Sequence, residues 1–154
     1  MRARACAVVV ALLGPGIAGS ALSQAPAPAG QCAKADFEAV VNDAGAALRD
    51  LTQQNLPVLQ GKLRQLKEKR SWSNDEFPKQ VESLVSDETV AGYNKKSEEL
   101  VARITGGGGQ GGATTASPDC TLLTSLQSDL KLLVDTQKAK WTHLLTKVER
   151  ELGK

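Results

Sequence analysis

The residues of this 154-residue chain whose types could support covalent or metal chemistry are three cysteines and one histidine. Cys32 and Cys120 are far apart in the sequence, and neither belongs to a CxxC pair. Zinc usually takes four nitrogen or sulfur ligands, so this set is a poor metal site. In an oxidising compartment, an even pair of cysteines most often forms a disulfide. We therefore predict a Cys32–Cys120 disulfide, no bound metal and no cofactor.

The single histidine, His143, is the remaining candidate for acid–base chemistry. A catalytic histidine needs a nucleophile and an orienting acid within hydrogen-bond reach, and the sequence singles out neither. Carboxylates occur close together in the sequence at 87–88, 98–99 and 149/151. Adjacent positions on a helix do not face one another, so these pairs are expected to be solvated rather than catalytic. We predict that the protein is not an enzyme.

A glycine tract at 105–117 contains the spacing G-x-G-x-x-G, through Gly106, Gly108 and Gly111. The dinucleotide-binding form of this motif must follow a strand and open a helix, and the surrounding sequence predicts neither. The tract also lacks the Lys-Ser/Thr ending of a P-loop. We predict a flexible link here and no phosphate site.

The first 23 residues have the order of a secretory signal peptide: Arg2 and Arg4, an apolar run at 5–19, then small residues. We predict a cleaved signal peptide at 1–23, with a cut after Ala21 as the alternative. A membrane-spanning helix needs about 20 apolar residues, and this run is shorter and interrupted by Gly-Pro-Gly. The mature chain is therefore expected to lack a transmembrane segment. It is expected to be exported, to a bacterial periplasm or otherwise secreted.

Removal of this leader changes the charge balance and the cysteine count. The whole chain has 19 basic and 17 acidic residues, and losing Arg2 and Arg4 leaves 17 of each. Nucleic-acid binding is typical of strongly basic domains, so this balance excludes it. Cys6 is also lost, which leaves the even pair described above.

The mature sequence predicts a Pro/Ala-rich tether at 24–31 and a single helical domain at 32–154. In the segment 32–70, Phe37, Val41, Ala44 and Leu48 follow one another at spacings of four, three and four, the period of a packed helix face. Pro57 should kink or break this helix, because proline removes a backbone donor and clashes with the preceding turn.

Two further helices are expected, at about 74–104 and 118–152. The second segment starts with a capping box, Ser73 and Glu76, but its apolar stripes are out of phase. The third starts at Ser117 and Pro118, a favourable N-cap and first helical position. One face of the third segment is apolar almost to the end of the chain: Leu123, Leu126, Leu130, Leu133, Trp141, Leu144, Val148 and Leu152.

These elements predict an all-α fold: an up-down-up three-helix bundle or helical hairpin. In that topology the first and third helices run parallel, so their starts, with Cys32 and Cys120, lie together. The apolar stripes of the two helices align at nearly the same offset as the cysteines. Asn55 and Gln137 interrupt these stripes and are expected to fix the register.

A cluster of basic residues with one tryptophan lies at the end of the first predicted helix: Lys62, Arg64, Lys67, Lys69, Arg70 and Trp72. Such a surface suits an acidic protein partner or an anionic envelope surface. Alternatively, its cations simply complement the C-terminal end of a helix. The leading functional prediction is an exported, non-enzymatic helical binding or scaffold protein of unknown partner. The alternatives are a carrier of an apolar ligand or lipid in the bundle core, and an envelope-associated stress or chaperone-like protein.

Overall fold

The computed structural model describes residues 32–111 and 119–154, although not the side chains after Gly106 in the first range. Four helices form this part of the chain: α1 (Lys34–Lys69), α2 (Phe77–Val85), α3 (Glu88–Gly111) and α4 (Cys120–Gly153). The predicted signal peptide, the tether and the predicted helix start at 117–118 lie outside the described residues.

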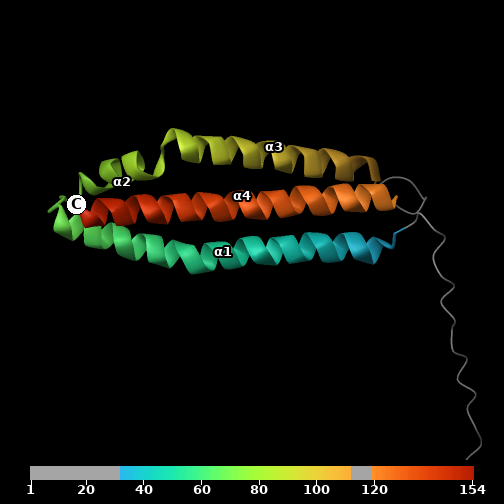
Figure 1. The fold of residues 1–154 in the computed structure, drawn as a ribbon, viewed down its shortest axis with the longest axis horizontal. Helices are drawn as coiled ribbons and strands as arrows, with labels where there is room; N and C mark the ends of the chain where they lie inside the picture. Colours follow the sequence, from blue (N-terminus) through green and yellow to red (C-terminus); the bar gives the residue numbers. More distant parts are fainter. Residues whose placement is uncertain (1–31, 112–118) are drawn as a thin grey trace, which may run out of the picture.

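The long C-terminal helix α4 is the centre of the fold, with α1 and α3 on its two sides (Figure 1). Helices α1 and α4 run in the same direction, and α3 runs in the opposite one. The all-α prediction is confirmed, but the described part of the chain has four helices rather than the three expected. The helices do not close into a bundle, because α1 and α3 each pack on α4 and hardly touch one another. The long helices α1, α4 and α3 form a single open layer with α4 in the middle.

The predicted second helix, 74–104, is two helices separated by a break at Ser86 and Asp87. The two out-of-phase apolar stripes belong to different helices, one to α2 and the other to α3. The break between these helices lets their apolar faces have different orientations. Helix α3 also continues to Gly111, so the predicted link at 105–117 is wrong over its first seven positions.

Pro57 neither ends nor breaks α1, which runs through it without interruption. The proline removes the N–H that the carbonyl of Gln53 would accept. Both residues are exposed, so water is available to that carbonyl. Figure 1 shows α1 changing direction near its middle, as expected of a helix that tolerates an internal proline.

The main apolar core lies at the end of the layer where α1 and α4 finish. Leu66 and Val148 are only 1% exposed there. Complete burial of such a side chain contributes about 1.5–3 kcal/mol. The core cluster consists of Leu59, Leu63, Leu66, Val90, Leu144 and Val148. Apolar side chains of α2 pack against it as partly buried residues, together with Trp72 and Trp141.

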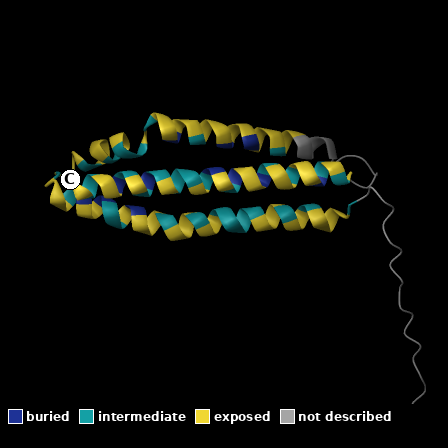
Figure 2. Cartoon of the chain, viewed as in Figure 1, coloured by how far each residue is buried: buried dark blue, intermediate teal, exposed yellow. Residues whose placement is uncertain are grey.

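The first part of α1 is packed differently, since no residue from Lys34 to Val58 is buried (Figure 2). The predicted stripe position Val41 is 48% exposed, and Val40 takes the half-buried position beside it. On α4, in contrast, Leu123, Leu130 and Leu133 are buried along the same stretch because α4 has a neighbour on each side.

The Cys32–Cys120 disulfide joins the starts of α1 and α4 and confirms the predicted pairing. The two Cα atoms are 5.1 Å apart, across a sequence separation of 88 residues. Asp119, the residue before α4, caps the helix by accepting a hydrogen bond from the backbone N–H of Thr121 at 2.9 Å. The bridge therefore aligns two parallel helices at their first residues.

The turn after α1 is a Schellman motif. The backbone N–H of Trp72 donates to Lys67 O at 3.0 Å, and that of Ser71 donates to Glu68 O at 3.1 Å. Ser71 occupies the left-handed position with a φ of 52°, where glycine is the usual residue. The motif ends α1 sharply and directs Trp72 back onto the core cluster.

Candidate functional site

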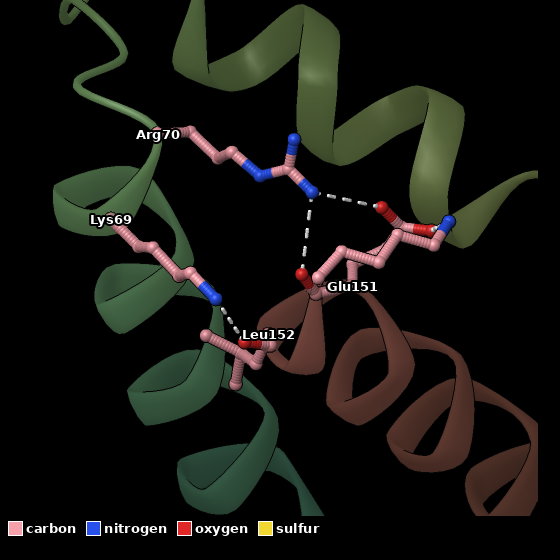
Figure 3. A network of polar contacts seen from close by, with 5 residues as sticks. Lys69, Arg70, Glu151 and Leu152 are labelled. Atoms are coloured by element: carbon pink, nitrogen blue, oxygen red, sulfur yellow. Dashed lines mark hydrogen bonds and ion pairs between the residues drawn. The ribbon is translucent and has the colours of Figure 1, made fainter.

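The predicted basic cluster lies where α1 and α4 end, and two of its members bind the end of α4 (Figure 3). Lys69 Nζ donates to the carbonyl of Leu152 at 2.6 Å. Arg70 Nη2 is 3.4 Å from both the backbone oxygen and the carboxylate of Glu151. These contacts supply donors to carbonyls that a helix C-terminus leaves unsatisfied.

Three other members of the cluster also have partners within the fold. Lys62 Nζ is 2.9 Å from Glu149 Oε1, which ties α1 to α4. Lys67 Nζ donates to Asn74 Oδ1 and lies 5.4 Å from the ring centroid of Phe77, a cation–π distance. Trp72 packs on the core cluster.

Arg64 differs from these residues because it is exposed and has no ion pair within residues 32–106 and 119–154. The structure thus brings the predicted cluster together at one end of the molecule, where four of its five cations bind other groups of the fold. A role of this cluster in binding stays a prediction.

A second polar cluster, which the sequence did not single out, is built around Asp87 at the break between α2 and α3. Asp87 Oδ1 accepts from the backbone N–H of Val90 at 2.9 Å and so caps the start of α3. Its other oxygen, Oδ2, lies 2.8 Å from His143 Nε2 and accepts from Lys147 Nζ at 2.9 Å, both on α4. One carboxylate therefore fixes the start of α3 against α4.

These donors determine the charge of Asp87. The hydrogen bond from Lys147, then that from His143, then the Val90 N–H hold the pKa of the carboxyl well below its ordinary value of 3.8. The expectation that Asp87 is simply solvated is wrong, because its side chain is 28% exposed and carries three bonds. In the sequence, this role was signalled by an Asp at a favourable N-cap position, three residues before Val90.

A hollow of about 200 Å³ lies beside this cluster, bordered by Asp87, His143, Thr146, Lys147, Arg150, Glu151 and Lys154. The ring of His143 also meets that of Tyr93 edge-on, with centroids 6.4 Å apart. Asp87 and His143 bond to one another, but no hydrogen bond joins Thr146 to the histidine among the described side chains. The arrangement joins α3 to α4.

Polar contacts continue along the α3–α4 interface and hold its register. Gln137 Nε2 donates to Ser97 Oγ at 2.7 Å, and this hydroxyl donates to Tyr93 O at 2.8 Å. Arg103 pairs with Asp129 at 2.9 Å nearer the disulfide. Gln137 thus links α4 to α3, not to the first helix with which its register was expected to be fixed.

Asn55, the other residue expected to fix the register, bonds within its own helix. Its Nδ2 donates to Leu51 O at 2.7 Å. It therefore satisfies its own amide in α1 without linking α1 to α4 through this bond.

A shallow hollow of about 610 Å³ lies at the start of α4, bordered by Cys120, Thr121, Thr124, Ser125 and Ser128. Across residues 32–106 and 119–154, no group of three or more metal-ligating side chains comes together. The same part of the chain contains no helix with the length and hydropathy of a membrane span.

No protein-family model matches the chain, and no curated protein or solved structure matches it either. Its function must therefore be argued from its own geometry.

Proposed function

We propose that the chain is an exported, non-enzymatic binding protein that uses the N-terminal half of α1 as its binding surface. The observation that carries this proposal is the exposure of the apolar side chains on this half. Phe37, Val40, Leu48 and Leu51 are only half-buried, and Val41 is 48% exposed. A partner that covers them would remove apolar surface from water, which favours binding by roughly 25 cal/mol per Å².

The disulfide makes this surface suitable for binding because it holds α1 in place before a partner arrives. Residues that are already ordered lose less conformational entropy when they bind. The Cys32–Cys120 bridge fixes the start of α1, and Leu59, Leu63 and Leu66 fix its end. The exposed half lies between these two attachments.

The Cys32–Cys120 disulfide also supports the proposal that the protein is exported. Disulfides persist in oxidising compartments such as the bacterial periplasm, and they are rare in the cytosol. The periplasm is therefore the proposed location, with secretion as the alternative.

The other two functions are less well supported. A ligand carrier needs room in the core, yet Leu66, Leu100 and Val148 are each only 1% exposed among the chain's own side chains. Attachment to an anionic envelope surface needs free cations, yet Lys62, Lys69 and Arg70 bind groups of α4.

Site-specific photo-crosslinking in the envelope of the source organism tests the proposal. A photoreactive side chain at Val41 should give a discrete protein adduct. The same group at Gln53, an exposed position on the side of α1 away from α4, serves as the matched control. Adducts of equal yield at both positions, or none at Val41, would contradict the proposed surface.

A further inference from the structure

We propose that α2 is a displaceable cover over the core cluster, and that the surface beneath it binds an amphipathic helical segment of a partner protein. This site lies at the opposite end of the molecule from the α1 surface and goes beyond the function proposed above. Helix α2 is then an internal ligand that an external helix replaces. Three features of the structure support this.

The first feature is the weak attachment of α2. It is nine residues long and contains no buried residue. Isolated helices shorter than about 12–15 residues are marginal in water, so α2 depends on its packing. That packing consists of four partly buried side chains, Phe77, Val81, Leu84 and Val85, on the core cluster. Its contact with α4 is the smallest among the helices that pack on α4.

The second feature is the independence of the neighbouring helices. Helix α1 is closed by its own Schellman motif before α2 begins. Helix α3 is capped by Asp87 and held to α4 by His143 and Lys147. Helix α2 therefore lies between two elements that are anchored independently of it. Its release does not disturb the packing of α1, α3 and α4.

The third feature is the surface that α2 covers. This surface belongs to the core cluster, which contains Leu66 and Val148, two of the three most completely buried side chains of the described chain. If α2 moves away, this apolar surface is exposed to water. A second helix that binds to it removes the surface from water again and so stabilises the state in which α2 is displaced. Such a helix shifts the population by its affinity for the open form.

The chemistry of the external helix follows from α2 itself. Apolar residues at 77, 81, 84 and 85 have the spacing i, i+4, i+7 and i+8, the anchor pattern of a helix that lies in an apolar groove. Asn74, in the turn before the first anchor, accepts a hydrogen bond from Lys67 at the basic end of α1, and the acidic residues Asp75 and Glu76 follow it. The best ligand is therefore an amphipathic helix with acidic residues before its first apolar anchor.

A peptide with the sequence of residues 73–87, carrying a fluorescent label, is the probe. Two protein variants alter α2 only at exposed positions: Lys79→Gly with Gln80→Gly weakens the helix, and Lys79→Ala with Gln80→Ala strengthens it. Fluorescence anisotropy should show about tenfold tighter peptide binding to the glycine pair than to the alanine pair, with the natural protein between them.

Two controls assign the effect to α2. Lys95→Gly with Lys96→Gly makes the same change at exposed positions of α3 and should leave peptide affinity unchanged. A peptide with Val81→Asp and Leu84→Asp should not bind any variant. Equal affinity of the glycine and alanine pairs, or no binding to either, would overturn the proposal.

Hydrogen exchange of the natural protein provides an independent measurement that needs no variant. The amides of α2 should exchange faster than those of residues 93–100 in α3. Equal protection of the two segments would overturn the proposal. A dimer of the glycine pair that excludes the peptide would assign the surface to α2 of a second copy, and would overturn its assignment to a partner protein.

Discussion

The two halves of α1 carry similar apolar periodicity but are held in different ways. After Pro57, the helix buries Leu59, Leu63 and Leu66 in the core cluster, and Trp72 turns back over this end. Before Pro57, no residue is buried, and the disulfide marks the start of the helix. The number of neighbours explains the difference, because the second half meets α4 and the apolar residues that follow α1, whereas the first half has only α4.

In the first half of α1, where no residue is buried, the disulfide takes over the role that packing has in the second half. A chain that buried both halves equally would need a closed bundle, with α3 against α1. Here α3 lies on the other side of α4 (Figure 1). The open layer leaves apolar surface available on the first half, and the disulfide compensates for the stabilisation that its burial would give.

Removal of the disulfide should have the largest effect. Replacement of Cys32 and Cys120 by serine should lower the free energy of unfolding by roughly 4–5 kcal/mol, because the bridge closes a long loop in the unfolded chain. Urea unfolding measures the loss. Hydrogen exchange should rise most in residues 34–50, and a uniform rise along α1 would contradict the proposed division of the helix.

The core substitution Leu66→Ala tests the other half of the comparison. Leu66 is 1% exposed, so its truncation should cost about 2–5 kcal/mol. The matched change Val41→Ala removes a side chain that is 48% exposed and should cost less than about 1 kcal/mol. Similar losses from the two variants, measured by chemical denaturation, would mean that the halves are packed alike.

Asp87→Asn tests the junction between α2 and α3. The folded-state pKa of this carboxyl lies below its ordinary value of 3.8, so the ionised form stabilises the folded protein. That contribution is fully present above pH 3.8 and is lost as the pH falls below it. The natural protein should therefore lose more thermal stability than the variant between about pH 5 and about pH 2.

Glu98→Gln is the control for this acid dependence. Glu98 is an exposed carboxylate of α3 that forms no ion pair with the rest of the described chain. This variant should follow the natural protein through the acid range, when both are monitored by circular dichroism. The same acid profile for Asp87→Asn and the natural protein would show that Asp87 does not fix α3 to α4.

The smallest expected effect is a gain in stability from Ser71→Gly. Ser71 has a φ of 52°, a conformation that glycine adopts without steric cost. The substitution should raise the free energy of unfolding by up to about 1 kcal/mol, measured by thermal denaturation. It leaves the disulfide half of α1 unchanged, so altered hydrogen exchange at residues 34–50 would contradict the separation of the two halves.

The sequence predicted the helical class and the disulfide, because the first depends on local periodicity and the second on cysteine pairing. It did not predict the open layer. The apolar stripe of α1 has the same spacing in a closed bundle as in a layer, so Val41 was expected on a packed face. Which neighbours a helix has is a property of the whole fold.

The candidate sites show the same limit. The cations at the end of α1 were recognised from composition, but their partners, such as Leu152 O and Glu149, come from the far end of the sequence. The Asp87–His143 pair was missed because its members are 56 positions apart and belong to different helices. Only the capping position of Asp87 had a local signal.

The central position of α4 has a consequence for how the molecule is made. Because α1 precedes α4 in the chain, α1 is synthesised before α4, yet α4 is the main neighbour of α1. The amphipathic helix α1 therefore lacks its main neighbour until α4 has been synthesised. Cys32 likewise has no Cys120 to pair with until α4 is present. The Cys32–Cys120 bond can therefore form only once α4 is available to pack against α1.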